Sequence, residues 1–408
     1  RYERAEELFA AAGDRDGLAA AVRGRAQAAH FDGDYEAAYE AASRACAIAA
    51  RGGDPIAKAK ALMDVGNALD ALGGSDAVLD HYRVAGDLFR AHDDVHGEAN
   101  VRTNLAVALR RRGDLDAAER TASRALDGYR TVGDEHREAV SLLNLSTVAE
   151  QRGAVGEAVA RAADARRIAE RLGSDMYEGF ALSHLGSAAH LAGDLDRAER
   201  FLTAALDLFD ALDADARSGM VTAILAEVAI DGGDLDAADR RIERTGSLLD
   251  DHAGRKRLAE TDRIRGRLAL ARGDPEAAAE ALEAAVEAAR EGGFTQVEAQ
   301  ALAALGEVAA ERGDVKEAAN RLTEALDLGR RIEDARATVA AADRLTDLLS
   351  GSGDAGKIDR EALREALAES PAEAVPAESA TDPAAYREVA DRWRVGGDGV
   401  GAAYPALG

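Results

Sequence analysis

Glycine recurs at a fixed interval of forty residues along this chain. Nine successive members of the series occur without a slip: Gly33, Gly73, Gly113, Gly153, Gly193, Gly233, Gly273, Gly313 and Gly353. Glycine makes up 40 of the 408 residues. Nine matches in a row therefore have a chance probability on the order of 10⁻⁹, and a strict period of this length is typical of a solenoid or repeat array. Seven of the nine glycines are followed directly by Asp.

The apolar residues on both sides of this glycine follow helical spacing. Leu142, Leu145 and Ala149 lie at i, i+3 and i+7 before the glycine of their repeat, as residues on one face of an α-helix do. Ala118 lies five residues after its glycine, and small or apolar residues recur at this position in the other repeats. Each repeat is therefore predicted to consist of two amphipathic helices.

Gly-Asp is predicted to form the turn between the two helices. Glycine ends a helix at least cost because it adopts the left-handed conformation without a Cβ penalty. The Asp carboxylate can accept hydrogen bonds from the free N–H groups that open the next helix. A second turn closes each repeat, as in RGGD at 51–54 and VGDE at 132–135. Its glycine shifts between repeats, which predicts a less constrained turn.

These positions resemble the pattern of the tetratricopeptide repeat family. Two repeats carry it in full: Leu182, Leu185, Gly186, Ala189, Gly193, Asp194, Ala198, Leu202 and Ala205; and Leu302, Leu305, Gly306, Ala309, Gly313, Asp314, Ala318, Leu322 and Ala325. The resemblance covers residues 1–369 and implies an all-α fold, a right-handed α-solenoid of antiparallel helix pairs. The usual period of the family is about 34 residues. The longer period here is similar to that of polarity adaptors, motor light chains and the sensor arms of large regulators.

The pattern weakens toward the C-terminus. In the repeat at 337–369 Ile358 replaces an alanine, which predicts a degenerate terminal cap. Residues 370–383 are rich in Pro and small residues and are predicted to form a linker. A short helix and a flexible tail are predicted for 384–408. This helix could pack on the array or on a partner, and the sequence leaves both open.

Composition narrows the classes of function. The net charge of −25 is spread along the chain and repels phosphate backbones and anionic membranes, so we expect no nucleic-acid partner and no membrane partner. We expect a cytoplasmic protein, since no apolar stretch is long enough to span a bilayer. The single cysteine, Cys46, cannot form an intrachain disulfide. No residues show metal-ligand or catalytic spacing, so we expect no metal, no cofactor and no enzymatic activity.

The candidate binding surface is the concave groove, which the family resemblance assigns to the first helix of each repeat. Positions 140, 144, 147 and 151 share one helical face with their equivalents forty residues away. The candidate groove residues are Lys60, Asp64, Asn67, Asn100, Asn104, Arg111, Asn144, Thr147, Gln151, Phe180, His184 and Met220. Four of the five asparagines of the chain are among them. Side-chain amides offer a donor and an acceptor to an extended peptide backbone. The alternative is that Asn104 and Asn144 only bond neighbouring helix ends.

The sequence therefore predicts a protein–protein interaction scaffold that binds a protein or peptide in its groove. The alternative is a sensor or autoinhibitory arm of a larger signalling ATPase, transcription regulator or effector enzyme whose catalytic part lies outside this chain. Arg1 already belongs to a helical pattern, so we expect a truncated first repeat and a fragment of a larger regulator. An upstream domain of the same protein would then be a further partner. The two interpretations are compatible.

Overall fold

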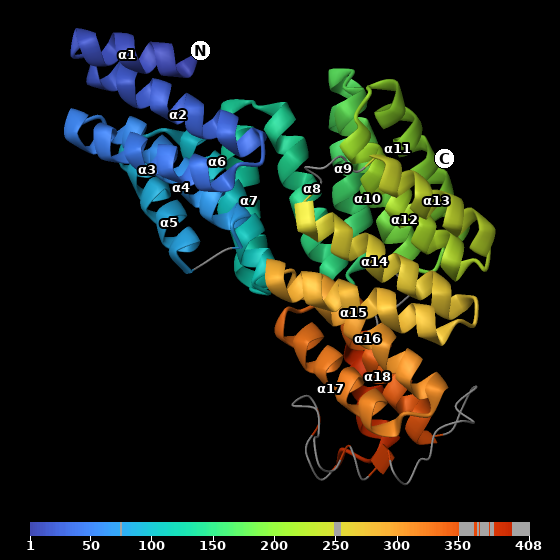
Figure 1. Cartoon of the computed structure of the whole chain (residues 1–408). Coiled ribbons are helices and arrows are strands. Elements are labelled where there is room, and N and C mark those ends of the chain that lie inside the picture. Colours follow the sequence, from blue (N-terminus) through green and yellow to red (C-terminus); the bar gives the residue numbers. More distant parts are fainter. Residues whose placement is uncertain are drawn as a thin grey trace. The chain divides into compact units, whose positions relative to one another are not determined.

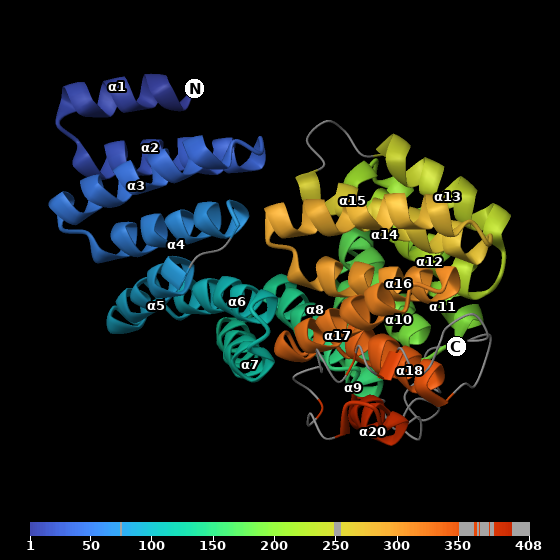
Figure 2. The same cartoon turned by 60° about the horizontal axis from the view of Figure 1, so that its bottom comes forward.

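The computed structural model describes residues 1–73, 76–248, 254–350, 363–364, 367, 375 and 379–393. Within these ranges all regular structure is helical, and they contain no strand. Successive helices run back and forth in antiparallel pairs, as Figures 1 and 2 show. The fold is therefore the all-α solenoid that the sequence predicts. None of the described helices is long and apolar enough to cross a membrane.

The chain divides into two compact units, Arg1–Asn144 (unit 1) and Leu145–Gly408 (unit 2). The helices of unit 1 are α1 (Tyr2–Ala12), α2 (Arg15–Phe31), α3 (Tyr35–Gly52), α4 (Pro55–Ala71), α5 (Asp76–Ala91), α6 (Val95–Arg111) and α7 (Leu115–Val132). The boundary falls within α8 (Glu135–Gln151). The helices of unit 2 are α9 (Val155–Leu172), α10 (Asp175–Leu191), α11 (Leu195–Ala211), α12 (Asp215–Asp231), α13 (Leu235–Leu248), α14 (Gly254–Ala271), α15 (Pro275–Gly292), α16 (Thr295–Arg312), α17 (Val315–Arg331), α18 (Ala335–Ser350) and α20 (Pro383–Trp393).

The glycines of the forty-residue series form the turns that the sequence predicts. Gly353 lies outside the described residues, and all the other members have a positive φ between 74° and 117°. The following aspartates begin the next helix: Asp114 Oδ1 accepts a hydrogen bond from the Ala117 amide at 3.1 Å. Ala118, one residue further along, is fully buried. The Gly-Asp turn is thus made by local chemistry that repeats with the sequence.

The second turn is as regular as the first, which corrects the expectation of a less constrained turn. In the described part of the chain, a residue with positive φ recurs at Gly13, Gly53, Asp93, Gly133, Gly173, Asp213, Gly293 and Glu333. Asp93, Asp213 and Glu333 have φ values of 55°, 51° and 53°. The turn therefore keeps its left-handed geometry where the sequence loses its glycine. The glycine of this turn keeps the forty-residue register wherever it occurs, and Asp or Glu replaces it in three repeats.

The two helices of a repeat approach closely where the first helix carries a glycine. A Cβ added to Gly186 of α10 would lie 2.5 Å from Leu202 Cγ of α11, and Gly306 faces Leu322 at the same distance. Leu202 and Leu322 are fully buried. Leu145 is 3% exposed, in agreement with its predicted core position. Small residues at the contact allow a core built mainly from Ala and Leu.

Helix α20 packs against α18. Tyr386 of α20 is fully buried in the same hydrophobic cluster as Leu345 of α18, and its hydroxyl donates a hydrogen bond to the Ala380 carbonyl at 3.0 Å. The helix predicted within 384–408 therefore contacts the array. Most of the predicted cap beyond residue 350, most of the linker at 370–383 and the tail after residue 393 lie outside the described residues.

Candidate functional site

The predicted groove residues lie on the first helices of their repeats and belong to both units. Unit 1 carries Lys60, Asp64 and Asn67 on α4, Asn100, Asn104 and Arg111 on α6, and Asn144 on α8. Unit 2 carries Thr147 and Gln151 on α8, Phe180 and His184 on α10, and Met220 on α12. Each set is described below with the unit to which it belongs.

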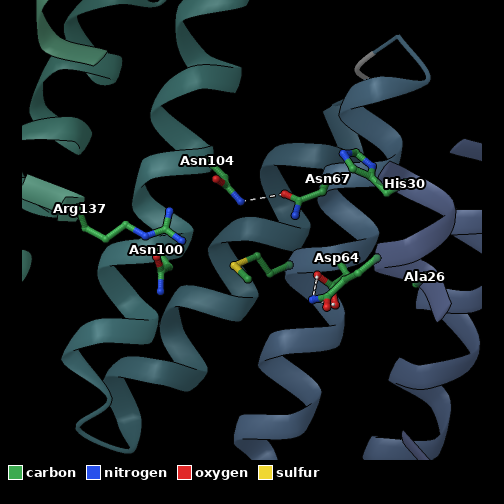
Figure 3. A pocket seen from close by; sticks show the side chains of 9 residues that line it. Ala26, His30, Asp64, Asn67, Asn100, Asn104 and Arg137 are labelled. Atoms are coloured by element: carbon green, nitrogen blue, oxygen red, sulfur yellow. Dashed lines mark hydrogen bonds between the residues drawn. The ribbon is translucent and has the colours of Figure 1, made fainter. Parts of the chain in front are cut away.

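Unit 1 contains a pocket of about 340 Å³ between α2, α4, α6 and the start of α8, shown in Figure 3. It is lined by Ala26, Gln27, His30, Met63, Asp64, Asn67, Asn100, Asn104 and Arg137. The structure thus brings together three of the predicted asparagines and the predicted aspartate. Lys60, Arg111 and Asn144 lie outside this lining, and Arg111 forms an ion pair with Asp70.

Asn67 and Asn104 form a hydrogen-bonded pair at the pocket (Figure 3). The Asn104 Nδ2 group donates to Asn67 Oδ1 at 2.8 Å, and the Tyr82 hydroxyl donates to the same oxygen at 2.8 Å. Burial raises the pKa of Tyr82 well above its ordinary value, so the hydroxyl remains a donor. In this arrangement Asn67 Oδ1 accepts both bonds. The described contacts leave the Asn67 amino group and the Asn104 carbonyl oxygen unpaired.

Asn100 is held by its own chain of hydrogen bonds. Its Oδ1 accepts from the Tyr129 hydroxyl at 2.9 Å, and its Nδ2 lies 3.1 Å from His96 Nδ1. His96 Nε2 in turn lies 3.0 Å from Asp134 Oδ2. If Nδ1 accepts from Asn100, Nε2 carries the proton that the Asp134 carboxylate accepts, so a single tautomer satisfies every contact. The Asn100 side chain is therefore oriented before any ligand arrives.

Asp64 supplies a buried acidic group to the pocket. The residue is 7% exposed. Its Oδ2 lies 3.0 Å from Arg23 Nε, and its Oδ1 accepts from Gln27 Nε2 at 3.3 Å. Burial raises the pKa of Asp64 to about 6, because desolvation outweighs the opposing effects of Arg23 and Gln27. Burial also lowers the pKa of His30, another lining residue. Asp64 therefore changes its charge near pH 6.

The sequence analysis missed Gln27, His30, Met63 and Arg137 in this lining. Gln27 lies forty residues before Asn67, so extending the groove series by one repeat would have found it. Met63 and Arg137 fall between the positions of that series. In the part of the chain that the structure describes, no group of three His, Cys, Asp or Glu side chains could hold a metal ion.

The predicted residues of unit 2 make contacts of several kinds and do not line the unit 1 pocket. Gln151 donates from Nε2 to the Ile332 carbonyl at 2.7 Å, and His184 Nδ1 lies 2.9 Å from Glu150 Oε1. Phe180 packs against the ring of Phe209, with centroids 5.3 Å apart. Met220 is 38% exposed, and Thr147 is half-buried.

The first helices of the repeats of unit 2 also carry charged residues that the sequence analysis did not name. Glu227 and Asp231 lie 80 residues beyond the groove positions 147 and 151. Arg267 lies 120 residues beyond position 147. Glu227 is 4% exposed and forms ion pairs with Arg263 and Arg336. Continuing the same forty-residue series beyond Met220 would have predicted Glu227, Asp231 and Arg267 as groove residues. Four of the nine residues that line the unit 1 pocket carry side-chain amides, whereas Glu227 in unit 2 is held by two ion pairs.

Comparison with protein families gives matches to the tetratricopeptide repeat. One family model of that description matches residues 97–171. A second model of the same description matches residues 179–202, 219–244, 259–284 and 299–323. These segments follow one another along the forty-residue series. A comparison with curated protein sequences gives no significant match.

Comparison with solved structures shows similar helical folds at low sequence identity. A Rap protein complexed with Competence and Sporulation Factor is 14% identical, with a TM-score of 0.56 over 77% of this chain and 98% of that one. The Rap conjugation gene regulator of the plasmid pLS20, in complex with the Phr* peptide, is 13% identical, with a TM-score of 0.55 over 87% and 93%. A signal transduction ATPase with a tetratricopeptide repeat sensor, from Pyrococcus horikoshii, is 14% identical, with a TM-score of 0.50 over 86% and 53%.

Proposed function

Because the chain is a tetratricopeptide repeat protein, we propose that it is an interaction scaffold that binds an extended peptide segment in the unit 1 pocket. The Asn67–Asn104 pair carries this proposal. It presents one unpaired amino group and one unpaired carbonyl oxygen on adjacent helices. A peptide backbone offers the complementary carbonyl and N–H groups, so the pair can bind a peptide whatever its side chains are.

The surroundings of the pair support binding over a purely structural role. An amide pair that served only to join α4 and α6 would need one hydrogen bond, and Asn104 Nδ2 already supplies it. Tyr82 and Tyr129 each add a bond that fixes an amide carbonyl, and Asn100 adds a third amide beside the pair. Polar groups that are oriented before binding lose less entropy when a ligand arrives. The solved Rap regulator in complex with the Phr* peptide gives a precedent for this fold with a peptide.

The test uses a random heptapeptide library selected on the immobilised protein. The selected peptides should bind the Asn67→Ala/Asn104→Ala variant about 10- to 100-fold more weakly, since each lost hydrogen bond to the backbone contributes about 0.5–1.5 kcal/mol. The affinities are measured by fluorescence anisotropy. Asn320→Ala is the matched control, because Asn320 is the remaining asparagine of the chain and is exposed on α17.

Equal affinity of the selected peptides for the wild-type protein and the double variant would contradict the proposed site, as would a library that yields no enrichment. A loss of affinity in Asn320→Ala as large as in the double variant would point to a different surface. The circular dichroism spectrum of each variant reports whether the helices are retained.

We propose as a second candidate that peptide binding serves a sensor function within a larger regulator. The similarity to the ATPase with a tetratricopeptide repeat sensor favours this candidate, and this chain covers 53% of that structure. The test adds a selected peptide to a longer product of the same gene and measures nucleotide hydrolysis. A change in hydrolysis supports the sensor, whereas capture of the peptide without such a change supports a scaffold alone.

A further inference from the structure

Glu227 of α12 joins helices that are far apart in the sequence of unit 2. One of its carboxylate oxygens pairs with Arg263 of α14, and the other accepts from Arg336 Nη1 of α18 at 2.9 Å. Arg336 lies 109 residues further along the chain. Burial alone would raise the pKa of Glu227, but Arg263 and Arg336 hold it far below its ordinary value. The carboxylate is therefore charged and depends on these two arginines.

A second set of polar contacts joins the turn just before α18 to the end of α8. Gln151 at the end of α8 donates from Nε2 to the Ile332 carbonyl at 2.7 Å, across 181 residues. Arg152 lies 3.6 Å from the carboxylate of Glu333, the next residue of the turn between α17 and α18. Glu333 has a φ of 53°, at the position where other repeats carry glycine. A side chain there costs backbone energy, and its carboxylate reaches Arg152.

The apolar contacts of unit 2 follow a different pattern. One hydrophobic cluster extends from Ala149 to Val228, another from Ala226 to Leu268, and a third begins at Ala278 and includes α15 to α18. Each cluster joins helices that are neighbours along the chain. This is the usual source of stability in a solenoid, where each repeat depends on its neighbours. The contacts of Arg336 and of Gln151 with their distant partners are polar.

We propose that Glu227, Arg336, Gln151 and the Ile332–Glu333 turn form a latch that closes one superhelical turn of unit 2. This inference concerns unit 2 and is independent of the peptide site in unit 1. The Glu227 carboxylate is buried and the Arg336 side chain is 38% exposed, so the cost of desolvating the carboxylate offsets part of their attraction, and the pair adds little net stability. Release of the latch hydrates its polar groups and leaves the apolar clusters between neighbouring helices intact. Unit 2 can then open without unfolding its helix pairs.

In the closed state the latch adds to a network of charged groups on the first helices of the repeats of unit 2. Asp231, one turn of α12 beyond Glu227, accepts hydrogen bonds from His190 Nε2 and Arg267 Nη2, each at 2.7 Å. These bonds join the first helices of consecutive repeats. Arg336 is the residue that adds the distant helix α18 to this network. Replacing Arg336 therefore removes the contact with α18 and keeps the contacts between consecutive repeats.

The test compares Arg336→Gln with Arg290→Gln by amide hydrogen exchange and mass spectrometry. Arg290 forms ion pairs with Glu298 and Glu324, which belong to the next two helices of the chain, so its variant loses the same charge without touching the latch. Arg336→Gln should accelerate exchange about tenfold in the turn at 332–334 and at the end of α8, as expected for local opening after loss of a charge-assisted hydrogen bond. Arg290→Gln should leave both segments at the wild-type rate.

A double variant distinguishes a latch from a general weakening of the fold. Glu227→Gln/Arg336→Gln should exchange in these segments no more than about twofold faster than the faster of its single variants, because Glu227→Gln already weakens the contact that Arg336→Gln removes. Unchanged exchange in Arg336→Gln would overturn the proposal, and so would multiplied effects in the double variant. A loss of helical circular dichroism in Arg336→Gln would also overturn it, since the helix pairs would then depend on the closure.

Discussion

Asp64 determines how the unit 1 pocket responds to pH. The folded protein holds its pKa at about 6, against an ordinary value of 3.8, because burial disfavours the charged carboxylate. The folded state therefore binds a proton more tightly than the unfolded state. By linkage this contribution to stability is present at low pH and is lost as the pH rises from about 4 through about 6. Asp64→Asn should remove that loss.

We expect Asp64→Asn to raise the free energy of unfolding at pH 8 by about 1–3 kcal/mol, since one pKa unit corresponds to about 1.4 kcal/mol. Near pH 4 the effect should be small, because the native Asp64 is already protonated there. Urea unfolding followed by circular dichroism at the two pH values measures the difference. Asp80→Asn controls for the change in net charge, because the Asp80 side chain is 74% exposed on α5. A gain of the same size at both pH values would contradict the assigned pKa.

At the scale of a helix and its turn, glycine has opposite roles at two kinds of position. Gly193 ends α10 with a φ of 77°, and a Cβ added there would meet no atom within 4 Å. Gly246 lies inside α13, where an added Cβ would make ordinary contact with Arg265 at 3.8 Å. Neither substitution creates a clash. Any difference between them therefore comes from the backbone.

Gly193→Ala should lower the free energy of unfolding by about 1–2 kcal/mol, because an L-residue is strained in the left-handed conformation. Gly246→Ala should raise it by about 0.5–1 kcal/mol, because alanine loses less backbone entropy in a helix. Thermal melts of the two variants under the same conditions provide the measurement. If both substitutions destabilised the protein to the same extent, the left-handed turn at Gly193 would not be the reason for its glycine.

At the scale of the whole molecule, features made by local chemistry could be predicted from the sequence. Gly193 and its following aspartate form a helix stop and a helix start within two residues, and the same pair recurs along the chain. At the second turn, Gly53 and Gly133 already lie 80 residues apart in the sequence, but only the structure shows that Asp93 and Glu333 adopt the same conformation. Turn geometry is conserved between repeats more strictly than residue type.

Contacts between repeats could be predicted only in part. Asn67 and Asn104 share one predicted face, and α4 and α6 bring them within hydrogen-bond distance. The pairing of Glu227 with Arg336 depends on the superhelical rotation that accumulates over three repeats. No short sequence motif specifies this total rotation, because each repeat contributes a small part of it through its own packing. Long-range polar contacts such as this one are therefore known only from the structure.

The division into two units predicts how far the effect of a destabilising substitution extends along the chain. Leu302 of α16 is fully buried in the hydrophobic cluster that includes α15 to α18, and Leu302→Ala should cost about 2–5 kcal/mol at that site. In a solenoid the loss acts mainly on neighbouring repeats. Hydrogen exchange should therefore accelerate in α15 to α18 while α2 to α7 of unit 1 keep the wild-type rates. Equal acceleration in both units would mean that the chain unfolds as one cooperative body and that the two units are not energetically separate.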